Sequence, residues 1–256
     1  MMDSIFNDVW FGKIGEYTSV EYSDSSMKKL LEILAAFQKG DFSQITELPK
    51  ISKSSSNTDV RRLALRLFLS AASHNDMILL SDMIDETSEN DVNDFCYFSE
   101  SSLSLQTLPY LLAMLETWEG TDVGEIVCQT IGYIIDCPSA QDGDCSPDEV
   151  ADECKLFLDT HDPQKYYYAG SEFFIGNFTK QLLNEVMTCK AQGKPYYSGQ
   201  ISSILSIATG IKCPVQPGVQ ITDLVAEKVM RYVKIVSAKK WMPGCKYFYG
   251  NIITNT

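Results

Sequence analysis

Basic residues and histidines are scarce in this chain of 256 residues, and their absence excludes several functions. Between Leu67 and Cys154 there are 19 Asp and Glu residues but no Lys or Arg. Such a stretch argues against the strongly basic concave face that nucleic-acid enzymes need. Only two histidines occur, His74 and His161, each where a helix is expected to end. A histidine there interacts favourably with the helix dipole, so neither requires a catalytic role.

Sequence signatures of active sites and metal centres are also missing. No H-E-x-x-H, G-x-S-x-G, P-loop or G-x-G-x-x-G pattern occurs. The eight cysteines are scattered without a C-x-x-C pair, which indicates reduced thiols rather than a disulfide framework or a zinc site. We therefore predict that the protein is not an enzyme and holds no metal and no cofactor.

One segment, Asp142 to Glu153, has the oxygen spacing of a calcium-binding loop. Pro147 stands at the sixth position, where such a loop turns sharply and needs a glycine. The run Ser146-Pro147-Asp148-Glu149 is better explained as a helix start, with Ser as the cap, Pro first and Glu three residues after the cap. We therefore predict a capped helix over 146–159 instead of a calcium site.

Targeting signals and long apolar runs are absent as well. The first residues, from Met1 to Phe6, lack a basic segment followed by an apolar one. No stretch approaches the roughly 18 apolar residues that a membrane-spanning helix needs. We expect a soluble, cytoplasmic protein that does not bind membranes.

Helical periodicity is what the sequence does contain. Apolar residues recur at helical spacing, and Ser, Thr, Asp and Gly stand at the segment ends. We predict an all-α fold, an irregular multi-helix array forming a single helical domain over 1–256. Its aromatic, glycine-broken N-terminal segment, residues 8–23, should form a short hairpin or an irregular strap. The clearest helices are expected at 25–39, 59–73, 76–86, 104–118, 121–136, 146–159, 172–190, 199–209 and 220–237.

Two of these helices begin alike, with Asp59-Val60 and with Asp122-Val123. The first resembles the inner helix of a HEAT repeat, a unit of roughly 40 residues whose helix pairs stack into a curved solenoid. Because the similarity is weakly periodic, a HEAT-like α-solenoid and an ordinary irregular helical domain both fit the pattern.

Charge is distributed unevenly along the chain. The net charge is −13, but the acidic part, 1–164, has 10 basic and 30 acidic residues, a balance of −20. The basic, aromatic-rich part, 165–256, has 11 basic and four acidic residues, a balance of +7. A surface of this kind keeps a protein soluble. It also attracts a basic partner and raises the rate of association.

The basic part interleaves lysines with aromatic residues, which is a composition found in single-strand nucleic-acid binders. The overall negative charge would repel a phosphate backbone, so we predict no nucleic-acid binding. The lysines, Lys246 among them, are expected to lay their stems on apolar surface and keep their charges in water.

Short segments rich in Gly, Pro and aromatic residues occur near both ends of the chain. They are Val9-Trp10-Phe11-Gly12, Gly193 to Gly199, Thr209 to Val215 and Trp241 to Gly250. In these segments the chain resembles bacterial immunity proteins that neutralise polymorphic or contact-dependent growth-inhibition toxins, and specifically the Immunity protein 47 family. The resemblance implies a cytoplasmic antidote that binds one cognate toxin domain. Many such toxins are nucleases with basic active sites, which an acidic antidote would complement.

If the protein is an antidote, the stretch without basic residues is the natural contact surface. Aromatic residues beside it would supply affinity, and carboxylates would steer the encounter. The alternatives are a HEAT-like scaffold or adaptor protein and a HEAT-like nucleic-acid enzyme that holds a flipped base. The acidic residues expected to contact the partner are Asp82, Asp85, Glu86, Glu89, Asp91, Asp94, Glu116, Glu119 and Asp122, and the aromatic anchors are Tyr97 and Trp118, with Phe98 and Tyr110 beside them.

Overall fold

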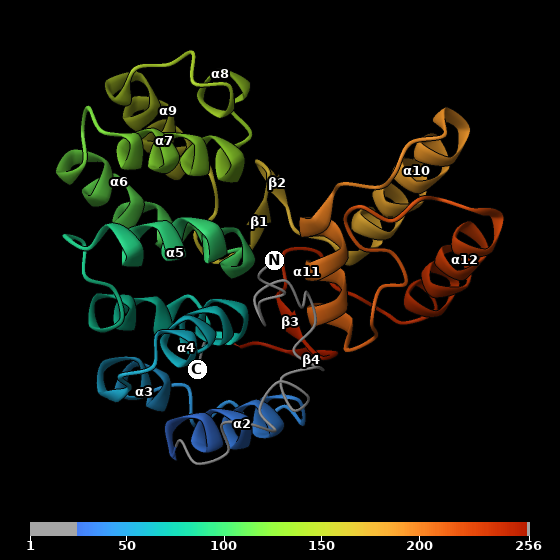
Figure 1. Ribbon diagram of the computed structural model, residues 1–256, viewed down its shortest axis with the longest axis horizontal. Coiled ribbons are helices and arrows are strands. Elements are labelled where there is room, and N and C mark those ends of the chain that lie inside the picture. The colour runs from blue at the N-terminus through green and yellow to red at the C-terminus, as the bar shows by residue number, and fades with distance from the viewer. Residues whose placement is uncertain (1–24, 255–256) are drawn as a thin grey trace.

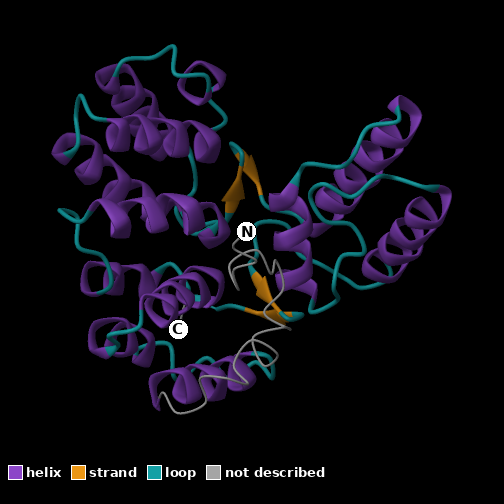
Figure 2. Ribbon diagram, in the orientation of Figure 1, coloured by secondary structure: helices purple, strands orange, loops and turns teal. Residues whose placement is uncertain are grey.

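Helices make up most of the part of the chain that the computed structural model describes, residues 25–254 (Figures 1 and 2). This confirms the predicted helical class, although two short β-hairpins interrupt it in the C-terminal part. The predicted N-terminal hairpin or strap lies outside the described residues.

Four helices lie one above another along the left side of the molecule in Figure 1: α2 (Ser25–Phe37), α4 (Thr58–Ala71), α5 (Glu89–Ser99) and α7 (Asp122–Ile135). Each packs against the next in this order. The two Asp-Val segments lie in the first turns of α4 and α7, so both belong to this stack. Further elements pack beside it: α3 (Glu47–Ser54), η4 (Asn75–Asp82), α6 (Leu108–Thr117), α8 (Pro138–Gln141) and α9 (Pro147–Thr160).

The C-terminal part forms a second group of elements, on the right in Figure 1. Helices α10 (Ile175–Gln192) and α12 (Asp223–Ser237) pack together, and α11 (Gly199–Thr209) packs on α10 and on β3. Strands β1 (Tyr167–Tyr168) and β2 (Ser171–Glu172) pair antiparallel, as do β3 (Tyr247–Phe248) and β4 (Asn251–Ile252). Short 3-10 turns, η5 (Glu100–Ser102) and η6 (Leu105–Thr107), connect α5 to α6.

Both hairpins escaped the sequence analysis because their turns use unusual residues. Each turn has two positive φ angles, at Ala169 and Gly170 in the first and at Tyr249 and Gly250 in the second. Two-residue turns of this kind favour Asn-Gly or Asp-Gly, since most side chains are strained at positive φ. Ala-Gly and Tyr-Gly therefore gave no recognisable hairpin signal.

The buried apolar side chains form two clusters. One is built mainly from α2 to α9, and the other mainly from α10 to α12 with Leu103 and Tyr166. Strand β3 joins them, because Tyr247 belongs to the second cluster and Phe248 to the first. Successive side chains of a strand point to opposite faces, so one short strand contacts both cores.

Helix boundaries agree with the predictions in some places and correct them in others. The capped start of α9 is confirmed: Ser146 and Glu149 form a reciprocal capping box with Pro147 at the first position. The cap of α4 is Asn57, whose side chain accepts from the backbone N–H groups of Asp59 and Val60, so the helix begins one residue before the predicted start at 59. The segment predicted as a helix at 76–86 is the shorter 3-10 helix η4.

Lys246 differs from its prediction. Its side chain is buried at 1% exposure, so the expectation that its charge stays in water is wrong. Its Nζ donates to the carbonyl oxygens of Leu69, at 2.7 Å, and Ala72, at 3.0 Å. These carbonyls belong to the C-terminal end of α4, where backbone acceptors lack partners and a cation is favourable. Burial lowers the pKa of the Lys246 ammonium to about 7.

His74 is also buried, and it stacks on Tyr166 with ring centroids 4.0 Å apart. Its Nδ1 lies 2.7 Å from Ser104 Oγ. Burial first, and the nearby Lys246 second, lower its pKa to about 4. The imidazole is therefore neutral at pH 7, so His74 does not act on the helix dipole as a cation, contrary to the prediction.

Candidate partner-binding groove

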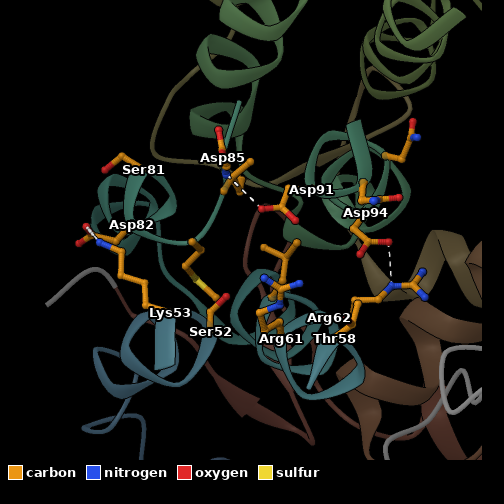
Figure 3. Close-up of a pocket in the computed structure, with 15 residues that line it drawn as sticks. Ser52, Lys53, Thr58, Arg61, Arg62, Ser81, Asp82, Asp85, Asp91 and Asp94 are labelled. Atoms are coloured by element: carbon orange, nitrogen blue, oxygen red, sulfur yellow. Dashed lines mark hydrogen bonds and ion pairs between the residues drawn. The ribbon is translucent and has the colours of Figure 1, made fainter. Parts of the chain in front are cut away.

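A groove of about 550 Å³ brings together several of the predicted contact residues (Figure 3). One side is formed by η4, the loop after it and the first turns of α5, and the other side by the end of α3 and the start of α4. Four predicted carboxylates line the groove: Asp82, Asp85, Asp91 and Asp94.

Three basic side chains that sequence reasoning missed, Lys53, Arg61 and Arg62, line the opposite side. Lys53 Nζ lies 2.6 Å from Asp82 Oδ1, and Arg62 Nε lies 2.7 Å from Asp94 Oδ1. The only available signal was the Arg61-Arg62 pair just before the stretch without basic residues. The groove therefore has mixed charge, and cations from α3 and α4 hold two of its four carboxylates, Asp82 and Asp94, in place.

The two ion pairs differ in their exposure to solvent. Both side chains of the Lys53–Asp82 pair are more than half exposed, whereas those of the Arg62–Asp94 pair are largely covered. Burial raises the pKa of Asp94, although the adjacent Arg62 guanidinium opposes the shift. Because an exposed ion pair contributes little to stability, the Lys53–Asp82 pair can open to a partner at low cost.

Asp85 and Asp91 form no ion pair with any described residue. Asp85 Oδ1 accepts hydrogen bonds from the hydroxyl of Thr87 at 2.7 Å and from its backbone N–H at 3.0 Å. These bonds lower the pKa of Asp85, so its carboxylate is charged at neutral pH. Asp91 Oδ2 accepts from the backbone N–H of Asp85, at 3.3 Å.

Some of the predicted residues also have a structural role at helix starts. Glu89 and Asp91 lie in the first turn of α5, which Ser88 caps, and Asp122 lies in the first turn of α7, which Thr121 caps. Carboxylates at these positions interact favourably with the helix dipole. Their presence is therefore explained in part without a partner.

A hydrogen bond connects the groove to the turn between α6 and α7. The indole N–H of Trp118 donates to the backbone carbonyl of Glu86, at 2.8 Å. Trp118 is half-buried against the core, so only part of its ring can contact a partner. The predicted contact residues that stay exposed at this turn are Glu116, Glu119 and Asp122.

Tyr97 lies one turn beyond Asp94 on α5 and is 56% exposed. It lines a second groove, of about 470 Å³, whose other side includes Gly199 and Ser203 of α11. The two neighbouring aromatic anchors are less available. Phe98 is buried, and the hydroxyl of the half-buried Tyr110 donates to the carbonyl of Met77.

A catalytic or metal centre would bring ligating or nucleophilic side chains together within residues 25–254. No cluster of three His, Cys, Asp or Glu side chains in that range could hold a metal ion. All eight cysteines, which lie in the same range, are free thiols. Among the helices described there, none has the length and apolarity that crossing a membrane requires.

The helical scaffold with a charged groove is suited to binding another protein. A family model for Immunity protein 47 matches residues 5–253. The chain therefore belongs to the Immunity protein 47 family, and membership in it implies an antidote with a cognate toxin as partner, not an enzyme. No curated protein and no solved structure matches the chain.

Proposed function

We propose that this protein is a cytoplasmic antidote that binds and neutralises a cognate toxin domain through its acidic surface. The contact surface would run from the groove carboxylates to the exposed acids at the turn between α6 and α7. We further propose that the toxin domain is basic, as a nuclease of a contact-dependent growth-inhibition system would be. Family membership supports an antidote, and the charge distribution supports a basic partner.

The observation that carries the proposal is that most carboxylates between Leu67 and Cys154 have no basic side chain paired with them among the described residues. Of the 19 acids there, ion pairs within the described residues involve Asp82, Asp94 and Asp152 alone. Uncompensated carboxylates repel one another and destabilise a fold. A basic partner would remove that repulsion and would be drawn to the surface by its field.

The stack of α2, α4, α5 and α7 supports a HEAT-like solenoid as the scaffold. The two helices with Asp-Val in their first turn occupy the same stack, as corresponding helices of a repeat would. A solenoid presents one continuous face to a partner, which suits a contact surface that extends over several helices.

The decisive experiment is co-expression with the toxin domain encoded immediately upstream of the gene. We expect growth rescue and a co-purifying complex whose association slows as salt rises. Rescue would also separate an antidote from a scaffold or adaptor, which has no reason to protect cells from that toxin. A well-folded protein that neither rescues growth nor forms a complex would contradict the proposal.

The acidic surface is tested by a triple variant, Glu86→Lys, Glu116→Lys and Glu119→Lys, because none of these residues caps a helix. We expect the association rate with the toxin to fall about tenfold or more at low salt and to depend less on salt. The matched control reverses three exposed acids at the α8–α9 end that also cap no helix, Asp144, Glu153 and Asp159, and leaves the predicted contact surface intact. Equal association rates for both triple variants would contradict the location of the surface.

A further inference from the structure

Glu100 is an acidic residue without a cation, and it was not among the predicted contact residues. It follows α5 directly and is half-buried. Its carboxylate has no ion pair and no hydrogen bond among residues 25–254. Burial raises its pKa to about 7. A carboxylate in such a place costs folding free energy, and no ion pair or hydrogen bond from residues 25–254 offsets the cost.

Glu100 lines a small pocket where two helices end. Ser99 is the last residue of α5 and Ile134 lies in the last turn of α7, and both line the pocket. The C-terminal end of a helix carries partial negative charge, which a basic residue in the last turn often neutralises. Neither α5 nor α7 has a basic residue in its last turn. The pocket is therefore negative for two independent reasons, the carboxylate and the helix ends.

Aromatic rings form the walls of this pocket. Tyr133 of α7 is 48% exposed, so it lies at the surface. Tyr168 of β1 lines the pocket too, and its ring is fixed edge-on against Phe178 of α10 at 4.9 Å. Tyrosine faces attract cations, and more strongly where water is excluded.

The pocket is narrow, with free space of about 10 Å³, room for about one water molecule. An ammonium group is about that size, whereas a planar guanidinium is larger. The small free space of the pocket therefore favours binding of a lysine side chain over an arginine side chain.

Backbone strain is also concentrated at the pocket. Leu103, with φ of 57°, and Ala169, with φ of 43°, both line it. Non-glycine residues at positive φ are uncommon and cost free energy, and they cluster at binding sites. A hydrogen bond from the backbone N–H of Tyr167 to the carbonyl of Leu103, at 2.8 Å, fixes this geometry.

We propose that the Glu100 pocket receives the ammonium group of a lysine side chain of the toxin domain. The inference rests on the proposed antidote function and extends it by naming a specific contact outside the groove. Glu100 would bind the ammonium in the pocket, and the lysine stem would lie outside it, against the exposed ring of Tyr133. The other titratable groups nearby are Tyr167, which also lines the pocket, and His74, which contacts the lining residue Ser104 and is neutral.

The test compares Glu100→Gln with wild type in titration calorimetry against the toxin domain encoded immediately upstream. The lysine ammonium pairs only with ionised Glu100, whose pKa in the free protein is about 7. Between pH 6 and pH 8 the affinity of wild type should therefore rise about tenfold more than the affinity of Glu100→Gln, which has no charge to gain. At pH 8, Glu100→Gln should bind at least tenfold more weakly than wild type. Glu153→Gln, an exposed carboxylate of α9 outside the predicted contact surface, should bind as wild type does.

A second measurement needs no variant. Wild-type complex formation at pH 7, measured in two buffers of different ionisation enthalpy, should release about half a proton from Glu100. Suppose that wild type binds the toxin normally but releases no proton, and that Glu100→Gln keeps the affinity and pH dependence of wild type. These results together would overturn the assignment of the lysine to the Glu100 pocket and would leave the proposed function standing. Failure of wild type itself to bind the toxin would instead contradict the proposed function.

Discussion

At the scale of single residues, the informative side chains are the buried charges, which a sequence does not mark as buried. Lys246 looks like any other lysine of the basic part, yet its Nζ caps a helix 174 residues away along the chain, at Ala72. Glu100 looks like one acid among many, yet it is half-buried with no ion pair or hydrogen bond among residues 25–254, and burial raises its pKa to about 7. Pairings over such distances depend on the whole fold, so periodicity and composition could not predict them.

Replacing Lys246 by Met should destabilise the protein, because the carbonyls of Leu69 and Ala72 would lose their donor. We expect a loss of about 2–4 kcal/mol in the free energy of unfolding, as for other buried polar groups left unpaired. Urea unfolding monitored by circular dichroism measures it. Lys240→Met, at an exposed position, serves as the control and should change stability by less than about 0.5 kcal/mol. Equal stabilities for the two variants would mean that the cap contributes nothing.

Glu100 should make stability depend on pH in a defined direction. Its pKa is about 7 in the folded state against 4.5 for the free side chain, so the folded state binds the proton more tightly. Stability contributed by this group is therefore present below pH 4.5 and is lost as pH rises through 7. Replacing Glu100 by Gln should stabilise the protein at pH 8 and have little effect at pH 5, in urea unfolding at the two pH values. If Glu100→Gln were less stable than wild type at pH 8, the raised pKa of an unpaired, half-buried Glu100 would be contradicted.

At the scale of elements, local signals were reliable where the helix end is encoded in adjacent residues. Ser146-Pro147-Asp148-Glu149 predicted the start of α9, and the structure shows the capping box. Local signals failed to predict elements whose formation depends on tertiary contacts. The helices α3, which is only eight residues long, and α5, whose apolar periodicity is weak, were missed, and two-residue strands are too short to leave a pattern. Four groove carboxylates were predicted from charge alone, but the three cations opposite them lie on α3 and α4, outside the stretch from which the contact residues were predicted.

The capping box of α9 gives a prediction at this scale. Ser146→Ala removes the side chain that accepts from the backbone N–H of Glu149 and donates to its carboxylate, at 2.8 Å. We expect a loss of ~1 kcal/mol in the free energy of unfolding, as is usual for N-caps. Ser237→Ala, at the exposed last residue of α12, is the matched control for thermal unfolding. No difference between the two variants would show that the cap is not needed.

At the scale of the whole molecule, the acidic and basic parts meet through a few contacts that cross between the two cores. Lys246 ties the β3–β4 hairpin to α4, and β3 places Tyr247 in one core and Phe248 in the other. Phe248 also lies edge-on to Phe37 of α2, with ring centroids 6.2 Å apart. The C-terminal hairpin therefore contacts the beginning of the described chain. We propose on this basis that residues 1–256 unfold as a single domain, although the acidic part and the basic part have opposite net charges.

This proposal predicts one cooperative unfolding transition, and two tryptophans can report it. Trp118 lies in the acidic part, where its indole donates to Glu86, and Trp241 lies in the basic part, where its indole donates to Val236. Variants that keep only one of the two, with the other tryptophans replaced by Phe, should show coincident urea midpoints, as a two-state transition requires. Adding Lys246→Met should separate the midpoints, because it removes the contact that joins the hairpin to α4. Midpoints that already differ without that substitution would mean two independently folding units, divided where the charge changes sign.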